Sequence, residues 1–368
     1  MVVKILHVIN SLALGGAENL TRELIPIMNQ MRGINIDILL LSDKDNVFDG
    51  QIIQEGVKID VLKLDKIYHP MAIIGIWQHI QKGAYDLVHA HTFPTQYWVA
   101  LSRPMVGKKI KYLTTEHSTH NRRREWPVFK YLDKFIYGFY DRIISVSEQT
   151  QDSLKTWVKP SKRQEKKYVV IENGVNIEKI RQVLPYEKED LIKGIPNGTT
   201  LLCMPGRFSQ AKDQATVIRA IKRLPENVHL LLVGEGDLIG DHKACVNQLG
   251  LGDRIHFLGF RQDIYRILKT VDLVVLSSHW EGFGMAAVEG MASGKPIVAS
   301  RVPGLSEVVE GAGFLFDPQN DEALAQCIQH LLGDEETYKE KARQGQIRAE
   351  EYDIHIMAKR MKDLYDAI

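Results

Sequence analysis

Residues 272–304 read DLVVLSSHWEGFGMAAVEGMASGKPIVASRVPG and form the most informative stretch of the chain. The apolar, β-branched start at 272–277 predicts a buried parallel strand, and the Gly-Phe-Gly turn at 282–284 leads into a helical pattern. In open α/β sheets, ligands bind beyond the carboxyl ends of the strands, where a helix N-terminus presents backbone N–H groups to an anion. Gly282 and Gly284 lack a Cβ, so the backbone there can approach a phosphate closely.

Two glutamates bracket this turn. Glu289, inside the predicted helix, could accept hydrogen bonds from a diol, and Glu281 could reach another part of the same ligand. Glutamates on a helix can also be ordinary surface charges. However, a glutamate that opens Glu-Gly-Phe-Gly, a second glutamate after seven residues and a following Gly-Lys-Pro-Ile-Val-Ala resemble the signature of the family 4 nucleotide-sugar glycosyltransferases. The resemblance implies the GT-B fold, an α/β architecture with two Rossmann-like domains facing each other across a cleft.

Length, charge and cysteine usage narrow the class of protein. A chain of 368 residues can form two domains with sizeable cores, and a net charge of +1 argues against a general nucleic-acid binder. The three cysteines are odd in number and far apart, which predicts neither a disulfide framework nor a zinc knuckle. The first residues lack the pattern of a signal peptide, and no apolar run reaches about 18 residues. We expect a cytoplasmic protein, with a peripheral contact at the inner face of the membrane as an alternative.

Apolar runs alternate with helical patterns along the chain, which indicates βα units and parallel sheets. The polar segment 175–199 predicts a linker. We therefore expect an acceptor-side domain of residues 1–174 with 352–368, whose last helix returns to it by resemblance, and a nucleotide-sugar-binding domain of residues 175–351. Strands are predicted at residues 4–9, 36–41, 58–64, 86–90, 110–115, 142–146, 168–171, 200–204, 228–233, 255–258, 272–277 and 296–300.

The first loop carries a pair of glycines, Gly15 and Gly16, at the start of a predicted helix. They could bring backbone N–H groups against a phosphate or a sugar, and a plain tight turn is the alternative. The Gly-x-Gly-x-x-Gly pattern of a dehydrogenase is absent. The string Gly-Gly-Ala-Glu is similar to the family's first loop, which implies that both glycines contact the donor.

Histidines gather at the ends of two predicted strands, as His89 and His91 and then His117 and His120. They could bind zinc, but no cysteine or carboxylate completes a convincing ligand set, so we predict no metal site. Asp43-Lys-Asp45 likewise reads as a plain loop. His89 could be a structural histidine. His91 and His117 resemble the family's two histidines at the mouth of the first domain, which implies acceptor binding by His91 and donor-sugar contact near the reacting centre by His117.

Residues 122–140 combine basic and aromatic side chains with an apolar face at helical spacing. Such a helix could lie at a membrane surface and meet a lipid-linked diphosphate acceptor, and Arg122, Arg123 and Arg124 are then candidate acceptor-binding residues. The alternative is a helix that packs its aromatic side chains into the core while its basic side chains stay solvated.

The second domain opens with a predicted strand followed by Arg207 and Lys212 on one loop. A guanidinium and an ammonium five residues apart could clamp a diphosphate, although isolated cations are usually solvated. The loop is similar to the family's Gly-Arg loop and lysine, which implies a clamp for the leaving group. Further along, Phe260 lies in a segment that looks like the family's base-facing turn, where the ring either stacks on a nucleobase or is buried.

These features predict a metal-independent retaining glycosyltransferase that moves a sugar from a nucleoside diphosphate sugar, by default UDP, to a hydroxyl of a glycan or lipid-linked acceptor. Polysaccharide or lipid-linked glycan synthesis is the expected role, and no cofactor is expected. Arg207, Lys212 and the backbone at Phe283 would stabilise the leaving diphosphate, Glu289 would hold the ribose, and Glu281 would orient the sugar with His117. The alternatives are a GT-B epimerase, a phosphorylase or a non-catalytic nucleotide-sugar-binding protein.

Overall fold

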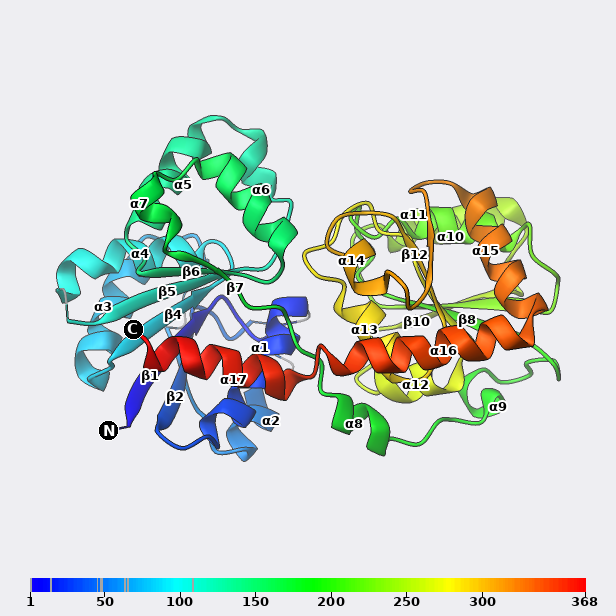
Figure 1. The fold of residues 1–368 in the computed structure, drawn as a ribbon, viewed down its shortest axis with the longest axis horizontal. Coiled ribbons are helices and arrows are strands. Elements are labelled where there is room, and N and C mark those ends of the chain that lie inside the picture. The colour runs from blue at the N-terminus through cyan, green and yellow to red at the C-terminus, as the bar shows by residue number, and fades with distance from the viewer. Residues whose placement is uncertain are drawn as a thin grey trace. The chain divides into compact units, whose positions relative to one another are not determined.

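The computed structural model describes residues 2–13, 15–44, 46, 49–62, 64, 66–107 and 109–368, so Asp45 of the Asp43-Lys-Asp45 loop lies outside the described residues. Its contacts divide the chain into two units. The N-terminal unit comprises Met1–Gly174 and Ile354–Ile368, and the C-terminal unit comprises Val175–Asp353. In each unit, helices pack on the faces of one parallel sheet (Figure 1).

Within the described residues, the N-terminal unit contains a seven-stranded sheet in the order β3-β2-β1-β4-β5-β6-β7. Its strands are β1 Val3–Ile9, β2 Ile34–Leu40, β3 Lys58–Val61, β4 Leu87–His91, β5 Lys111–Glu116, β6 Arg142–Ser145 and β7 Tyr168–Val170. Its helices are α1 Gly16–Asn29, α2 Asp49–Gln54, α3 Met71–Gly83, α4 Thr95–Val106, the 3-10 turn η1 Arg122–Glu125, α5 Val128–Gly138, α6 Glu148–Val158, α7 Lys162–Glu165 and α17 Ile354–Asp366.

The described part of the C-terminal unit contains a six-stranded sheet in the order β10-β9-β8-β11-β12-β13. Its strands are β8 Thr200–Pro205, β9 Val228–Val233, β10 Ile255–Gly259, β11 Leu273–Leu276, β12 Ile297–Ser300 and β13 Phe314–Phe316. Its helices are α8 Ile177–Gln182, α9 Lys188–Leu191, α10 Gln214–Ile221, α11 Ile239–Leu249, α12 Ile264–Thr270, α13 Met285–Ala292, α14 Ser306–Val309, α15 Asp321–Gly333 and α16 Glu335–Glu350.

Both sheets have the doubly wound strand order, in which the chain reverses direction across the sheet beside the first strand of the unit. The reversal falls between β1 and β4 in the N-terminal unit and between β8 and β11 in the C-terminal unit. Ligands of such sheets bind at the carboxyl ends of the strands next to this reversal. The loops after β8 and β11 are therefore the place where the fold favours a ligand, and the stretch from Asp272 to Gly304 supplies one of them.

The predicted strands are all present, and their ends differ from the prediction by a few residues. The largest shift is at β3, which ends at Val61 because its only partner, β2, ends opposite that residue at Leu40. The short edge strand β13 was not predicted. The segment at 175–199, predicted as a linker, contains α8 and α9, and α8 packs against α13.

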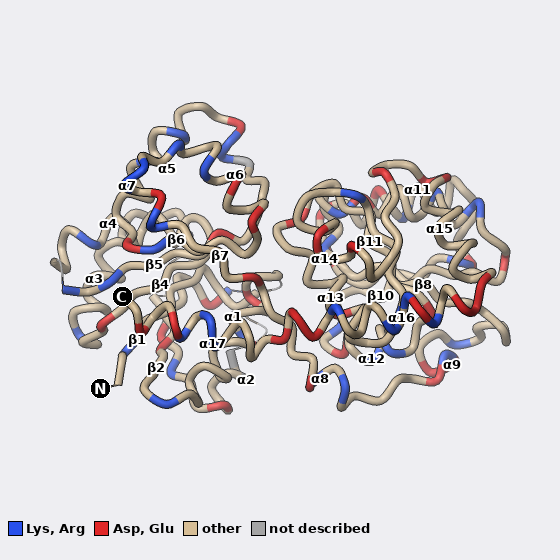
Figure 2. The backbone as a smooth tube through the Cα atoms, viewed as in Figure 1, with Lys and Arg blue, Asp and Glu red and all other residues tan. Residues whose placement is uncertain are grey.

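The final helix, α17, belongs to the N-terminal unit and packs against α1. Its buried face carries Ile354, Met357, Met361 and Tyr365, and Ile356 is 39% exposed. Lys and Arg alternate with Asp and Glu along the chain in both units (Figure 2). Among the described residues, no helix is both long and apolar enough to cross a membrane.

Candidate functional site

The loop that follows β8 is anchored to the loop that follows β11. The Ser277 hydroxyl donates to the backbone oxygens of Lys212, at 3.2 Å, and Asp213, at 2.7 Å. The backbone N–H of His279 donates to the oxygen of Ala211 at 2.8 Å. These bonds bring residues about 65 positions apart in sequence to one corner at the carboxyl end of the sheet.

An ion pair joins the two loops at this corner. Lys212 Nζ lies 2.5 Å from Glu281 Oε1, and the Ser278 hydroxyl donates to the same oxygen at 2.7 Å. The two charged side chains are 22% and 12% exposed. A cation and an anion are thus held next to each other at the edge of the sheet, each still reachable from solvent. The sequence predicts a diphosphate contact for Lys212 and a sugar contact for Glu281. The contact between the two side chains was not predicted.

Glycines allow the neighbouring loops to pack backbone against backbone. A Cβ on Gly234 would lie 2.2 Å from the oxygen of Gly206, and a Cβ on Gly236 would lie 2.3 Å from the oxygen of Phe208. The aliphatic part of Lys212 passes 3.5 Å from the position of a Cβ on Gly206. Side chains at these positions would push the loops apart, so the glycines set the course of the loop that carries Lys212.

The turn before α13 is equally tight. Gly284 begins the helix with φ of +88°, and Gly304 lies against the turn, because a Cβ there would be 2.5 Å from the oxygen of Glu281. The Phe283 ring points inward, is 4% exposed and packs edge-on against Tyr352. The contact of this turn with a ligand stays a prediction. Gly284 has no side chain to cap α13, and the first turn of that helix carries no acidic residue.

The other predicted donor residues lie around this corner of the C-terminal unit. Arg207 is exposed on the same loop as Lys212, and Glu289 is buried in α13 with 8% exposure. Phe260 is partly buried and directly follows β10. We call Arg207, Lys212, Glu281, Glu289 and the turn 282–284 the donor corner.

In the N-terminal unit, His91 is buried between two other histidines. It is 6% exposed, and its two ring nitrogens lie 2.9 Å from His7 Nδ1 and 3.3 Å from His117 Nε2. The ring links two other histidines in the interior, and its acceptor-binding role stays a prediction. His117 is partly buried at the end of this row, and burial lowers its pKa to about 4.

Three buried histidines, His7, His89 and His91, place ligand atoms within 4.8 Å of one another. Every ring nitrogen of the three lies within hydrogen-bond distance of another group, including Tyr365 and Thr115. The group has no carboxylate, and its hydrogen bonds account for all six nitrogens. His7 was missed from the sequence, although it lies beside His89 in the register of β1 and β4.

The first-loop glycines lie at the N-terminus of α1. Gly15 is the N-cap, with extended backbone, and Gly16 is the first residue of the helix. A Cβ on Gly15 would lie 2.1 Å from a carboxylate oxygen of Glu18. An anion that approached this helix end would have to displace that carboxylate.

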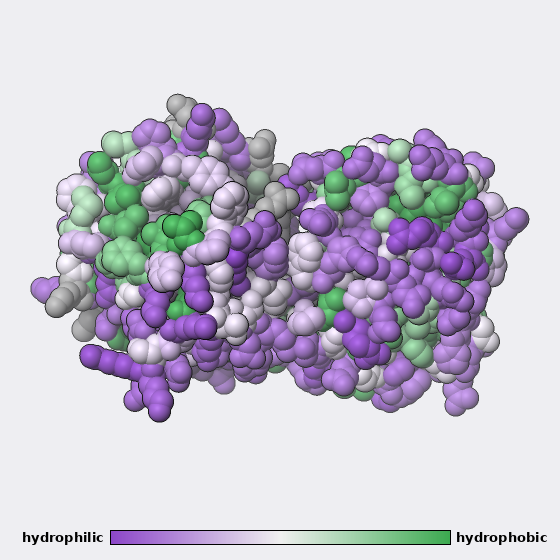
Figure 3. Space-filling view, turned by 90° about the horizontal axis from the view of Figure 1, so that it is seen from above, coloured by the Kyte–Doolittle hydropathy of each residue, from purple (hydrophilic) through white to green (hydrophobic). Residues whose placement is uncertain are grey.

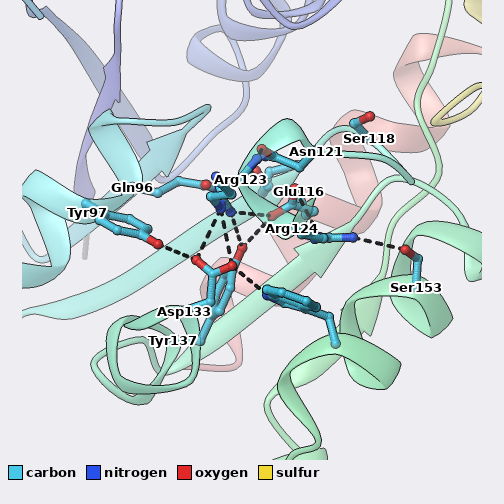
Figure 4. A network of polar contacts seen from close by, with 12 residues as sticks. Gln96, Tyr97, Glu116, Ser118, Asn121, Arg123, Arg124, Asp133, Tyr137 and Ser153 are labelled. Carbon is cyan, nitrogen blue, oxygen red and sulfur yellow. Dashed lines mark hydrogen bonds and ion pairs between the residues drawn. The ribbon is translucent and has the colours of Figure 1, made fainter. Parts of the chain in front are cut away.

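The arginines predicted to bind the acceptor are structural (Figure 4). Arg123 is 6% exposed, and its Nε donates to the buried carboxylate of Asp133 at 3.2 Å while its Nη2 donates to the Tyr137 hydroxyl at 3.1 Å. Arg124 donates to the Ser153 hydroxyl at 2.9 Å. A buried carboxylate requires a cationic partner, which gives Arg123 a structural role, and acceptor binding by either arginine stays a prediction. The Arg122 side chain lies outside the described residues.

The same segment exposes some of its apolar side chains and buries others. Trp126, Val128, Tyr131 and Phe135 are 66%, 67%, 77% and 58% exposed. Figure 3 looks down on this side of the N-terminal unit and shows apolar side chains gathered there. The alternative prediction of buried aromatics is confirmed at Tyr137 and Tyr140, which are 3% and 0% exposed, and is wrong at Trp126, Tyr131 and Phe135. Its solvated arginines are wrong at Arg123, which is buried.

Comparisons with known proteins agree with this architecture. Residues 14–179 match the family described as Glycosyltransferase Family 4, and residues 186–348 match Glycosyl transferases group 1. The chain is 30% identical over 266 residues to glycosyltransferase MJ1178 of Methanocaldococcus jannaschii, covering 71% of this chain and 69% of that protein. It is 26% identical over 279 residues to the UDP-Gal:alpha-D-GlcNAc-diphosphoundecaprenol alpha-1,3-galactosyltransferase of Escherichia coli, covering 72% and 70%. HepE of Anabaena, solved with UDP and glucose, superposes with a TM-score of 0.87 at 23% identity over 100% of both chains.

The two parallel α/β units have the GT-B fold. More narrowly, the chain belongs to family 4, the glycosyl transferases group 1, as its Glu281 and Glu289 motif predicted. The enzyme is therefore a transferase of sugars, and the non-catalytic alternative is set aside.

Proposed function

We propose that this enzyme transfers a sugar from a UDP-sugar donor to a hydroxyl of a lipid-linked glycan, with retention of the anomeric configuration and without a metal ion. The observation that carries the proposal is the Lys212–Glu281 pair held against the glycine turn of α13. The Escherichia coli relative, which acts on a diphosphoundecaprenol-linked sugar, supports the acceptor class. HepE, solved with UDP and glucose, supports the donor base.

Departure of the diphosphate is the demanding step of such a transfer, because negative charge grows on the β-phosphate as the glycosidic bond breaks. The Lys212 ammonium, the exposed Arg207 guanidinium and the backbone N–H groups at the start of α13 are the donors that would stabilise this charge. Each preorganised donor of this kind contributes about 3 kcal/mol. A helix N-terminus adds its positive dipole end without any proton transfer.

The two glutamates would hold the rest of the donor. Glu281 keeps its hydrogen bond from Ser278 when a diphosphate draws Lys212 away, so its carboxylate is then positioned to accept from a sugar hydroxyl. Glu289, buried in α13, would accept from the ribose diol. In the N-terminal unit, a pKa of about 4 keeps His117 neutral at pH 7, so it would act on the donor sugar as a hydrogen-bonding group and not as a cation.

The apolar side chains exposed along α5 suit a lipid-linked acceptor. Trp126, Val128, Tyr131 and Phe135 would enter the headgroup region, with Lys134 exposed beside them for anionic lipid. Flotation with vesicles that contain phosphatidylglycerol should recover the wild type, and should lose the triple variant Trp126→Ser, Tyr131→Ser, Phe135→Ser.

The control for vesicle binding is a triple serine variant at Ile53, Tyr68 and Met71, which are exposed elsewhere on the same unit. Equal recovery of both triple variants would refute the membrane contact.

The transfer itself is tested with UDP-sugars and an undecaprenyl-diphosphate-linked sugar in EDTA. We expect UDP release to depend on the acceptor, and the anomeric proton of the product to show the donor's configuration by NMR. An inverted product, or activity that returns only when a divalent metal is added back, would refute the corresponding part of the proposal. The Lys212→Ala variant is the matched control for contaminating activity.

A further inference from the structure

Six side chains of the N-terminal unit form one unbranched row of hydrogen-bonding contacts. His117 Nε2 lies 3.3 Å from His91 Nδ1, and His91 Nε2 lies 2.9 Å from His7 Nδ1. His7 Nε2 lies 3.1 Å from the hydroxyl of Tyr365 on α17, which lies 2.7 Å from His89 Nδ1. His89 Nε2 ends the row 2.7 Å from the Thr115 hydroxyl.

The interior of this row is shielded from water. His7, His89 and His91 are 1%, 0% and 6% exposed, and Tyr365 is 3% exposed. Burial lowers the pKa of His7 to about 3 and the pKa values of His89 and His91 well below their ordinary range. At pH 7 each ring is therefore neutral, with one N–H donor and one acceptor nitrogen.

Neutral rings in a single row can satisfy every contact in only two ways. If His117 donates from Nε2, then His91 and His7 must also donate from Nε2, Tyr365 must donate to His89, and His89 must donate from Nε2 to Thr115. If Thr115 donates instead, every ring carries its proton on Nδ1. Any mixed arrangement places two donors or two acceptors face to face inside the unit, which leaves buried polar atoms without partners.

We propose that Tyr365 is a positioning residue that couples the four histidines into one common tautomer and thereby decides what His117 presents at Nδ1. Within the described residues, that nitrogen has no hydrogen-bond partner of its own. In one state of the row it is an acceptor, and in the other it is a donor. The effect on catalysis rests on the proposed position of His117 beside the donor sugar. The coupling of the tautomers does not depend on that position.

The coupling is tested on the free wild-type enzyme, labelled with ¹⁵N-histidine, by two-bond ¹H–¹⁵N NMR. The expected result is the same fraction of Nε2–H tautomer in His7, His89, His91 and His117. Different fractions among the four rings would overturn the proposal. One equivalent of bound zinc in the purified enzyme, with histidine spectra that change in EDTA, would overturn it in favour of a metal site.

Two variants cut the row at different points. Tyr365→Phe removes the hydroxyl between His7 and His89, so the fraction at His89 should separate from that at His117. Thr115→Val removes the terminal hydroxyl with little change of shape, so all four fractions should shift together. Unchanged fractions in both variants would overturn the coupling, and the second variant keeps the test decisive if the first does not fold.

The control is Met361→Leu, which alters the buried face of α17 without touching the row. In the transfer assay, Tyr365→Phe should lower kcat about threefold or more, with the UDP affinity unchanged, whereas the control should leave both values near wild type. A kcat equal to wild type would refute the positioning role. Failure of all transfer by the wild type would refute the proposed function and leave the tautomer measurement intact.

Discussion

Replacement of Lys212 by alanine removes the cation at the centre of the donor corner. Its ammonium is 2.5 Å from Glu281 and 22% exposed, so it is fixed in place and partly shielded before any ligand arrives. Loss of one preorganised donor costs about 10² to 10³ in kcat, or about 2.7 to 4 kcal/mol. Because Arg207 and the α13 N-terminus remain, we expect the lower end, about a 100-fold loss of kcat.

The same change should weaken UDP binding, because a hydrogen bond to a charged group contributes about 1.5 to 3 kcal/mol. Isothermal calorimetry with UDP and a coupled assay of UDP release measure the two effects. Folding should change little, since Glu281 keeps its hydrogen bond from Ser278. The control is Lys222→Ala, an exposed lysine at the end of α10. Turnover within about threefold of wild type would refute the role of Lys212.

Three further predictions follow from the packing and the buried charges. Gly304→Ala should abolish UDP binding in a calorimetric titration, because the new Cβ would lie 2.5 Å from the oxygen of Glu281. The control is Gly311→Ala, which should keep UDP binding, because Gly311 has a similar φ of +78° and open space around it. Glu289→Gln should weaken UDP binding about tenfold or more, and an unchanged Kd would remove its ribose role. His7 has a folded pKa of about 3 against about 6.5 unfolded, so the stability it contributes is complete above pH 6.5 and declines toward pH 3. Urea unfolding at pH 6.5 and 5 should therefore show a smaller loss for His7→Gln than for wild type, by about 1.6 kcal/mol over this interval, and equal losses would contradict the buried neutral state.

Much of the fold could be predicted because each strand of a covered parallel sheet is a continuous apolar run. β9 matches its predicted bounds, and β8 pairs with it along its whole length. The length of an edge strand depends on its single neighbouring strand as well as on its own sequence. The end of β3 was therefore misplaced, and β13, only three residues long, was missed. The helices at 175–199 were missed because that segment is short, polar and stabilised by its contact with α13.

The candidate site was predicted by residue type and motif, and its contacts were not. Lys212 and Glu281 are 69 residues apart, and only the anchoring of one loop on the other brings them together. The burial of Arg123 could not be predicted, because a basic run usually indicates a solvated surface, whereas Arg123 neutralises Asp133 inside the unit. Tyr365 carried no signal for a role beyond packing, because its hydroxyl meets the histidine row only after α17 returns to the N-terminal unit.

A crystal structure of the enzyme with UDP is the most direct measurement of the donor corner. We predict the β-phosphate within about 3 Å of Lys212 Nζ and of backbone N–H groups in the turn 282–284, with the ribose hydroxyls on Glu289. A diphosphate bound elsewhere, with Lys212 still held only by Glu281, would contradict the proposed donor site.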